Sequence, residues 1–369
     1  MGRGVSQVPL ARRNLLAEPR RLAASAVGVG LAVMLILLLD GLWAGIREQA
    51  TLYTDKSGAD LYVLQPGVRD LTAGTSVLPL STLDTVRADP DVSWAAPVRT
   101  TYVVLQLHST KVAAYVVGSV PGLQGGPWSI TNGRETRADD EIVLDRLLAD
   151  RHGIDVGDTL SVIGRPLRVV GLSDSSAFMF PYVFVTHSAT DTALGADTTS
   201  MIVAGASKPL DVSRRLHAAG LNVKLRDEVA ANDERLATGI YGSPIRLMVA
   251  IGFAAGTLII ALTGYSAIIE RRREYGIVKA MGATGSRLIR AAVAQTSAIA
   301  GLGLAAGIAL FVAGRGLIGE LRPQFAVVLS TGSVGRAAVA ALAMALLAAI
   351  VPAGRLAALE PAVAYRSAT

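Results

Sequence analysis

The sequence of 369 residues contains no cysteine. This absence excludes disulfide bonds, thiolate nucleophiles and metal sites with cysteine ligands. Charged residues are also scarce, at 17% of the chain, whereas 51% of the residues are hydrophobic and the mean hydropathy is +0.45. A composition this apolar is unusual for a soluble protein of this size, so it indicates that part of the chain lies in a membrane.

Sequence motifs of several enzyme classes are missing as well. There is no GxxxxGK[ST] phosphate loop, so the chain is not expected to hydrolyse ATP by that route, and no GxSxG motif is present. The stretch Gly301–Gly307 fits GxGxxA by letter, but it lies inside an uncharged apolar run. The four histidines lack the paired spacing of a metal site, and we expect surface or turn positions for all of them: His108, His152, His187 and His217. We therefore expect neither a catalytic residue nor a metal or other cofactor on this chain.

The basic residues are distributed unevenly. Residues 40–245 hold 24 of the 29 acidic residues and 18 of the 35 basic ones, which leaves 5 acidic and 17 basic residues elsewhere, beside apolar runs. A nucleic-acid groove would instead combine clustered bases with aromatic residues, and aromatics are only 5% of the chain. The pattern is typical of membrane topology signals, and no nucleic-acid partner is expected.

Four long apolar runs are present: Leu22–Leu39, Leu247–Ile269, Ala291–Gly314 and Ala337–Val351. The first has a basic start, which would also fit a cleaved signal peptide. It is longer than a typical signal-peptide core, and no clear cleavage site follows it, so an uncleaved membrane anchor is favoured. Glycines recur at four-residue spacing within two of these runs, at 252 and 256 and at 303 and 307, which predicts close contacts between helices.

The runs predict an α-helical integral membrane protein with four transmembrane helices and a mixed α/β extracytoplasmic domain between the first and second. The arginines set the orientation, because residues 1–21 carry five bases and one acid and residues 270–290 carry six bases and two acids. The expected segments are a cytoplasmic amphipathic segment 1–21, transmembrane helix 22–40, extracytoplasmic domain with stalks 41–245, transmembrane helix 246–269, cytoplasmic helix 270–290, transmembrane helix 291–314, extracytoplasmic loop 315–336, transmembrane helix 337–354 and cytoplasmic tail 355–369.

The extracytoplasmic domain, called the outer domain below, has the residue patterns of strands and helices. Strands are predicted at 60–65, 102–107, 112–117, 159–163, 167–170 and 182–186, and helices at 81–88, 143–151 and 212–219. In one stretch, Asp140 or its neighbour can cap a helix that Gly153 stops. Gly157-Asp158 can then turn the chain into a hairpin that ends at Gly171.

The segment 270–290, with the sequence ERRREYGIVKAMGATGSRLIR, lies between two apolar runs. Its charges of both signs and its glycines describe a short helical hairpin at the membrane surface. Two interpretations are equally open from composition: a helix that docks on a cytoplasmic partner, or a solvated positive-inside loop.

This segment resembles the ExxxEIGxxKAxGA signature of FtsX/MacB-type ABC transporter permeases, the group that includes lipoprotein-release, macrolide-export, heme-export and glycolipid-export subunits. The matching residues are Glu270, Arg271, Glu274, Gly276, Lys279, Ala280, Gly282 and Ala283, while Tyr275 stands where an apolar residue is usual. The tail LEPAVAYR resembles the closing DPxxALR of the family through Glu360, Pro361, Ala364 and Arg366. The heme- and glycolipid-export branches are the most similar in outline.

The resemblance implies a homodimer that pairs with two copies of an ABC ATPase subunit, which would hold ATP and Mg²⁺. It implies that 270–290 is the coupling helix and that the cargo is hydrophobic or amphiphilic, such as a lipid, a heme-like or a drug-like compound. A membrane-fusion or other envelope protein is a further expected partner beside the lipid bilayer. The alternative is an FtsX-like mechanotransducer that controls an envelope hydrolase without transport. A membrane-anchored enzyme or adhesin would leave the 270–290 signature unexplained.

Overall fold

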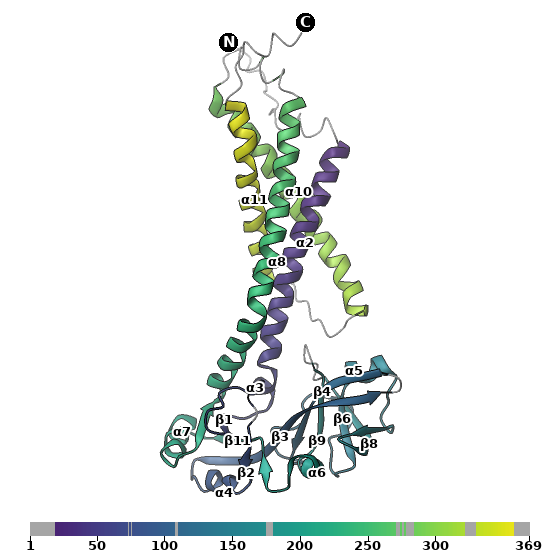
Figure 1. Ribbon diagram of the computed structural model, residues 1–369, viewed down its shortest axis with the longest axis vertical. Coiled ribbons are helices and arrows are strands. Elements are labelled where there is room, and N and C mark those ends of the chain that lie inside the picture. The colour runs from purple at the N-terminus through teal and green to yellow at the C-terminus, as the bar shows by residue number, and fades with distance from the viewer. Residues whose placement is uncertain are drawn as a thin grey trace, which may run out of the picture. The chain divides into compact units, whose positions relative to one another are not determined.

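The computed structural model describes residues 19–72, 74, 76–107, 110–174, 180–270, 274, 277, 284–321 and 330–357. The chain forms two compact units (Figure 1). The helical unit consists of the described parts of Met1–Ala44, Ser243–Leu321 and Val327–Thr369. The outer domain consists of the described residues of Gly45–Gly242.

Four long helices contain the apolar runs of the sequence: α2 (Pro19–Ala50), α8 (Arg226–Glu270), α10 (Gly285–Leu321) and α11 (Thr331–Ala357). Each contains a segment long and apolar enough to cross a membrane, at Leu22–Ala50, Arg226–Glu270, Ala292–Gly316 and Thr331–Ile350. The prediction of four membrane helices with a mixed α/β domain after the first is therefore confirmed. The helix α11 begins before Ala337, where the apolar run of the sequence starts.

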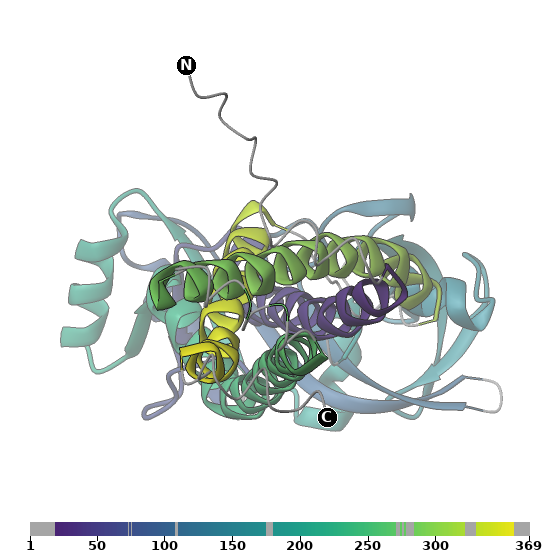
Figure 2. The same ribbon diagram turned by 90° about the horizontal axis from the view of Figure 1, so that it is seen from above.

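Glycines allow α2 and α10 to approach closely in the helical unit (Figure 2). A Cβ atom built on Gly307 would lie 2.7 Å from Val33 Cβ and 2.9 Å from the carbonyl oxygen of Gly30. A Cβ atom on Gly303 would lie 2.4 Å from Val29. Since real Cβ atoms do not tolerate such distances, only glycine permits this contact, and the close packing predicted from the glycine spacing is confirmed.

The outer domain is built on a mixed sheet in the order β12-β1-β11-β3-β4-β9-β6-β8-β5, with β7 paired to β8, and a separate pair β10-β2. Its strands are β1 (Leu61–Leu64), β2 (Leu78–Pro79), β3 (Val92–Leu107), β4 (Thr110–Ser119), β5 (Ile130–Gly133), β6 (Glu141–Asp145), β7 (Thr159–Val162), β8 (Arg165–Ser173), β9 (Tyr182–Thr186), β10 (Thr198–Thr199), β11 (Met201–Ala206) and β12 (Asn222–Leu225). Short helices complete the domain: α3 (Leu52–Lys56), α4 (Thr82–Arg87), α5 (Arg146–His152), η1 (Ser188–Thr190), α6 (Asp191–Leu194) and α7 (Pro209–Ala218).

Two faces of the sheet are buried against different apolar clusters. In β1 all four residues are buried: Leu61 and Val63 face a cluster that includes residues of α4 and α7, while Tyr62 and Leu64 face an aromatic-rich cluster. This alternation follows from the two-residue period of a strand, and burial on both faces explains why β1 is uniformly apolar. The long strand β3 pairs with β11 through its first half and with β4 through its second half.

The helix expected at 143–151 is wrong in its first part. Residues 143–145 belong to the buried strand β6, and α5 begins only at Arg146. The cap is Asp145 and not Asp140, because the Asp145 Oδ1 atom accepts a hydrogen bond of 2.9 Å from the Leu148 backbone N–H. The apolar residues of β6 and α5 run on without a break in the sequence, so periodicity alone does not separate them.

The later part of this stretch follows the prediction more closely. Gly153 ends α5 in the left-handed conformation, with φ of 62°. The chain turns at Gly157 into the β7-β8 hairpin, as expected. The tight turn of that hairpin is Ile163-Gly164, and both residues have positive φ, as a type I′ turn requires.

Candidate functional site

The described residues of the coupling segment are few but informative. Helix α8 ends at Glu270, and α10 begins at Gly285. Between them, Glu274 and Ile277 are helical and exposed, with 43% of the Ile277 surface accessible. Residues three apart lie on one side of a helix, so a carboxylate and an apolar side chain share one exposed face here. The remaining residues predicted for coupling lie outside the described residues: Arg271, Gly276, Lys279, Gly282 and Ala283, as do Glu360, Pro361 and Arg366 of the tail motif.

An ion pair joins α2 and α11 within the helical unit. Arg336 donates two hydrogen bonds to Asp40, from Nε to Oδ1 at 2.9 Å and from Nη2 to Oδ2 at 2.6 Å. The Asp40 side chain is 19% exposed. The sequence predicts Asp40 at the end of the first membrane helix and Arg336 in the loop 315–336 before the fourth, and no motif in it predicts their pairing. The signal was available, because both residues lie at the extracytoplasmic ends of their runs and carry opposite charges.

The outer domain contains a cavity of about 300 Å³, at the lower end of the size range of small-molecule sites. Six parts of the chain form its wall: the last turns of α2, helix α3, the loop after β1, the sheet, Phe180 before β9, and the first turns of α8. Its lining residues are Ile46, Gln49, Ala50, Tyr53, Thr54, Leu71, Thr72, Thr100, Tyr102, Tyr115, Phe180, Tyr182, Met201, Asp233, Leu236, Ala237, Ile240 and Tyr241. The wall is thus mostly apolar and aromatic, with one carboxylate.

That carboxylate belongs to Asp233, which is 2% exposed. Its Oδ1 atom accepts hydrogen bonds from the backbone N–H groups of Leu71 and Thr72, at 3.0 and 3.1 Å, and from the Thr72 hydroxyl, at 2.8 Å. Burial away from water raises the pKa of Asp233 to about 6, and these hydrogen bonds oppose the shift. Asp233 therefore ties the loop after β1 to α8 and keeps an ionisable group at the cavity wall.

Aromatic side chains pack around the same cavity. The rings of Tyr102 and Tyr115 lie 4.8 Å apart, and Tyr182 contacts Tyr115 edge-on at 5.6 Å. Behind Tyr182, the Trp128 ring lies at 5.4 Å. Burial raises the pKa of Tyr53, Tyr115 and Tyr182, so these hydroxyls stay neutral at physiological pH.

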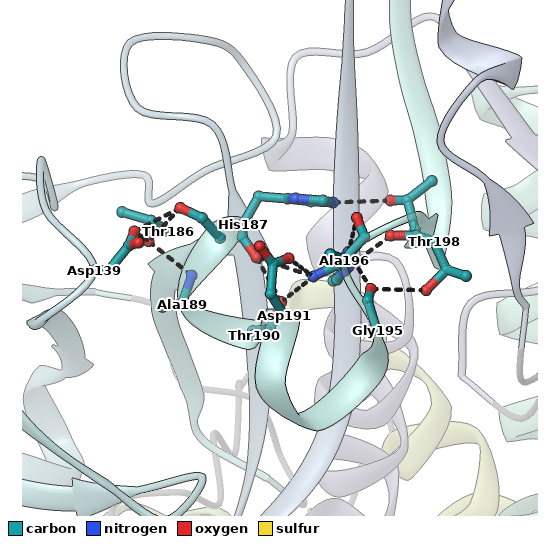
Figure 3. Close-up of polar contacts among 12 residues, drawn as sticks. Asp139, Thr186, His187, Ala189, Thr190, Asp191, Gly195, Ala196 and Thr198 are labelled. Carbon is teal, nitrogen blue, oxygen red and sulfur yellow. Dashed lines mark hydrogen bonds and ion pairs between the residues drawn. The ribbon is translucent and has the colours of Figure 1, made fainter.

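A second buried polar cluster includes Thr190, Asp191 and Gly195 (Figure 3). Its central side chain is Arg99, in the middle of β3. The Arg99 side chain is 1% exposed and forms an ion pair with Asp191. Its other acceptors, at 2.6–3.3 Å, are the carbonyl oxygens of His187, Gly195, Ala196 and Thr198 and the Thr190 hydroxyl. These acceptors come from one continuous turn region, η1 to β10, so Arg99 fastens that region to the sheet. Its donors point to protein atoms, which indicates a structural role.

His187 lies in the turn after β9, in agreement with the expected surface or turn position, but its side chain is buried beside this cluster. Burial and the neighbouring Arg99 charge lower the pKa of His187 to about 4, so the ring is neutral at pH 7. Among the described residues, no group of three or more histidine or carboxylate side chains is placed to hold a metal ion. His108 lies outside the described residues.

The cavity was not predicted from the sequence. Its residues are drawn from segments up to 195 positions apart, from Ile46 to Tyr241, and no short motif links them. The available signal was the clustering of tyrosine and phenylalanine in the outer domain of a chain poor in aromatic residues.

Two family descriptions match the chain. Residues 22–234, more than half of the chain, match the MacB-like periplasmic core domain, and residues 246–361 match the FtsX-like permease C-terminal region. An uncharacterized ABC transporter permease of Mycobacterium tuberculosis H37Rv is 27% identical over 363 residues, which are 96% of this chain and 98% of that protein. An uncharacterized ABC transporter permease of Mycobacterium bovis is 26% identical over 359 residues, covering 96% of this chain and 98% of its own length.

Two solved structures share a distant similarity. One is the extracellular domain of the noncanonic ABC-type transporter YknZ from Gram-positive bacteria, with a TM-score of 0.36, 13% identity, and coverage of 46% of this chain and 99% of that domain. The other is the periplasmic region of MacB from Actinobacillus actinomycetemcomitans, with a TM-score of 0.38, 15% identity, and coverage of 48% and 94%.

Proposed function

This chain belongs to the MacB/FtsX-type ABC transporter permeases, and from that membership we propose that it is the membrane subunit of an exporter for a hydrophobic or amphiphilic cargo. As a member it is a multi-pass protein of the inner membrane, with its large domain outside and an ATPase subunit as partner. We propose that two copies of the chain pair with two copies of the ATPase, which holds the ATP and Mg²⁺.

The observation that carries the coupling proposal is the exposed helical face of Glu274 and Ile277 between α8 and α10. An exposed apolar side chain beside a carboxylate fits a contact with another protein, because contact with a partner removes the apolar surface from water. We propose that this face docks on the ATPase and that Glu270, Arg271, Gly276, Lys279, Gly282 and Ala283 complete the coupling helix. The tail residues Glu360, Pro361 and Arg366 are proposed to lie on the same side of the membrane.

The proposed movement runs through α2 and α8. Each helix contains a membrane segment and also residues of the outer domain, since α2 continues to Ala50 and α8 begins at Arg226. An ATP-driven displacement at the end of α8 would therefore be passed along the helix to the outer domain. Cargo would be taken from the outer leaflet or the outer domain. This agrees with the lack of a charged residue in the apolar runs 247–269 and 291–314.

The test uses the chain co-purified with its ATPase subunit in lipid nanodiscs. The variant Glu274→Lys should assemble normally with the ATPase subunit. The wild-type chain should raise the rate of ATP hydrolysis by that subunit, and the variant should lose most of this stimulation. The matched control is Asp227→Lys, which makes the same charge change at the outer-domain end of α8, where the side chain is 90% exposed. Normal coupling in Glu274→Lys at a normal membrane level would show that the segment is a solvated loop.

An export assay in the same complex separates the two remaining functions. Coupled ATP hydrolysis together with export of an amphiphilic dye supports the exporter. Coupled hydrolysis that activates a co-purified envelope hydrolase, with no export of any amphiphile, would show the FtsX-like mechanotransducer instead.

A further inference from the structure

The outer-domain cavity holds a carboxylate that has no counter-ion among the described residues. Among the described residues that line it there is no arginine, lysine or histidine, and Asp233 is its one acidic side chain. All three hydrogen bonds that Asp233 accepts end on Oδ1, and no described residue donates to Oδ2. A buried charge normally has a partner or is neutralised, because removing it from water costs on the order of several kcal/mol. In Asp233, the Oδ2 atom has no such partner among the described residues.

A second polar atom at the cavity wall also has no hydrogen-bond partner among the described residues. The Tyr182 hydroxyl is in a residue that is 9% exposed, and within the described part of the chain it forms no hydrogen bond. The neighbouring tyrosines differ, because the Tyr102 and Tyr115 hydroxyls donate to the carbonyl oxygens of Thr72 and Leu71, at 3.2 and 3.4 Å. The cavity thus presents one carboxylate oxygen and one hydroxyl with no partner among the described residues. The rest of its wall is mostly apolar or aromatic, with the polar side chains of Gln49, Thr54, Thr72 and Thr100.

We propose that this cavity binds a small amphiphilic cation: a molecule with an apolar or aromatic body and one protonated amine that donates to Asp233 Oδ2. The negative electrostatic potential over the tyrosine rings also attracts a cation, so the rings and the carboxylate favour the same ligand class. A volume of about 300 Å³ limits the ligand to a compact molecule. The ligand could be a cargo of the transporter or an effector that α2 and α8 sense, and both share this chemistry.

The probes are three molecules with one apolar body and different charge: phenylbutylamine, phenylbutanol and phenylbutyrate. Binding to the full-length chain in nanodiscs is measured by calorimetry without ATP or the ATPase subunit, so the result does not depend on the proposed transport function. We expect the amine to bind at least about tenfold more tightly than the alcohol, the order expected for a hydrogen bond to a charged group. The carboxylate probe should not bind. Equal affinity for the amine and the alcohol would overturn the proposal.

Two variants locate the binding. In Asp233→Asn the amide oxygen can still accept the hydrogen bonds from Leu71 and Thr72, so the loop stays in place, but the preference for the amine over the alcohol should disappear. In Ala237→Phe the added ring should fill the cavity and abolish binding of both probes. Each variant is checked for an intact outer domain by its thermal unfolding. An amine preference that survives Asp233→Asn, or binding that survives Ala237→Phe, would overturn the proposal.

The dependence on pH gives an independent test. Asp70 is the charged neighbour whose field raises the pKa of Asp233, beside the larger effect of burial, and the surrounding tyrosines stay neutral in this range. Because the pKa of Asp233 is about 6, lowering the pH to about 5 protonates it and should weaken amine binding about tenfold. The affinity for the alcohol should not change. If the affinity for the amine also stayed the same over this pH range, the proposed contact with Asp233 would be contradicted.

A last arm separates cargo from effector, with the ATPase partner present. Accumulation of labelled phenylbutylamine across the membrane in an ATP-dependent manner identifies a cargo. A change in ATP hydrolysis without accumulation identifies an effector. Both outcomes support the site when Asp233→Asn removes them. An effect of the amine on transport or hydrolysis that is unchanged in Asp233→Asn would place the responsible site elsewhere.

Discussion

Asp233 carries its charge at a cost to the stability of the outer domain. An aspartate whose folded-state pKa is about 6, above the unfolded value, favours folding in its protonated form. The contribution of Asp233 to the free energy of unfolding is therefore most favourable at low pH, and it is lost as the pH rises through about 6. Asparagine would have the same shape at this position without the cost. The presence of a carboxylate here is therefore consistent with use of its charge for binding.

We therefore predict that Asp233→Asn stabilises the outer domain above pH 6. The pKa displacement corresponds to at most roughly 3 kcal/mol near pH 8, and the effect should vanish below about pH 3, where the aspartate is mostly protonated in both states. Thermal unfolding of the full-length chain, followed by tryptophan fluorescence at several pH values, measures this difference. The control Asp227→Asn, at a 90% exposed side chain on the same helix, should change the midpoint little at every pH. Destabilisation by Asp233→Asn near pH 8 would show that the ionised form contributes favourably.

Arg99 represents the opposite use of a buried charge. Its guanidinium donates to acceptors in η1, α6 and the residues that follow, so it contributes to the structure and leaves no donor aimed at a cavity. We predict that Arg99→Ala destabilises the outer domain by on the order of 3–5 kcal/mol, because the Asp191 charge and several buried carbonyls lose their partner.

Arg99→Lys tests the geometry behind that number. A lysine keeps the charge but has three donors on one nitrogen, and it cannot reach acceptors on both sides as the planar fork does. It should recover part of the stability lost in Arg99→Ala, leaving a deficit of about 2 kcal/mol in denaturant unfolding. Full recovery would mean that charge alone matters at this position.

At the scale of elements, the sequence predicted the helices that are continuous apolar runs, but it did not predict features that form by the packing of distant segments. The four membrane helices were predictable because each is a single uncharged run. The boundary between β6 and α5 was not, since Val143, Leu144 and Leu148 are all buried and apolar in a strand and a helix that follow each other directly. The cavity could not be predicted either, because it depends on the packing of six segments and on the burial of Asp233, which no local sequence pattern indicates.

The glycines of α10 give a test at the same scale. We predict that Gly307→Ala weakens the helical unit, because its Cβ atom would overlap Val33 and the backbone oxygen of Gly30 in α2. Gly301→Ala on the same helix is the matched control, since a Cβ atom there meets nothing within 4 Å. Alanine should be neutral or stabilising at Gly301, by up to about 1 kcal/mol of helix propensity. Heat-resistant monodisperse protein in detergent is the readout, and equal behaviour of the two variants would mean that the α2-α10 contact contributes little.

The charge distribution of the whole molecule predicts the topology, and the absence of cysteine makes that topology easy to measure. A single introduced cysteine is the only thiol in the chain, so labelling by a membrane-impermeant maleimide reports one position without background. Asp150→Cys lies in the outer domain at a side chain that is 62% exposed, and Ser286→Cys lies at an exposed residue in the first turn of α10. Since the basic residues concentrate at the N-terminus and in 270–290, Asp150→Cys should be labelled in intact cells. Ser286→Cys should be labelled only after the membrane is permeabilised.

The cysteine-free chain is the control for both. Labelling of Ser286→Cys in intact cells would place the coupling segment outside, where no ATPase subunit could reach it, and would remove the basis of the coupling proposal together with the topology.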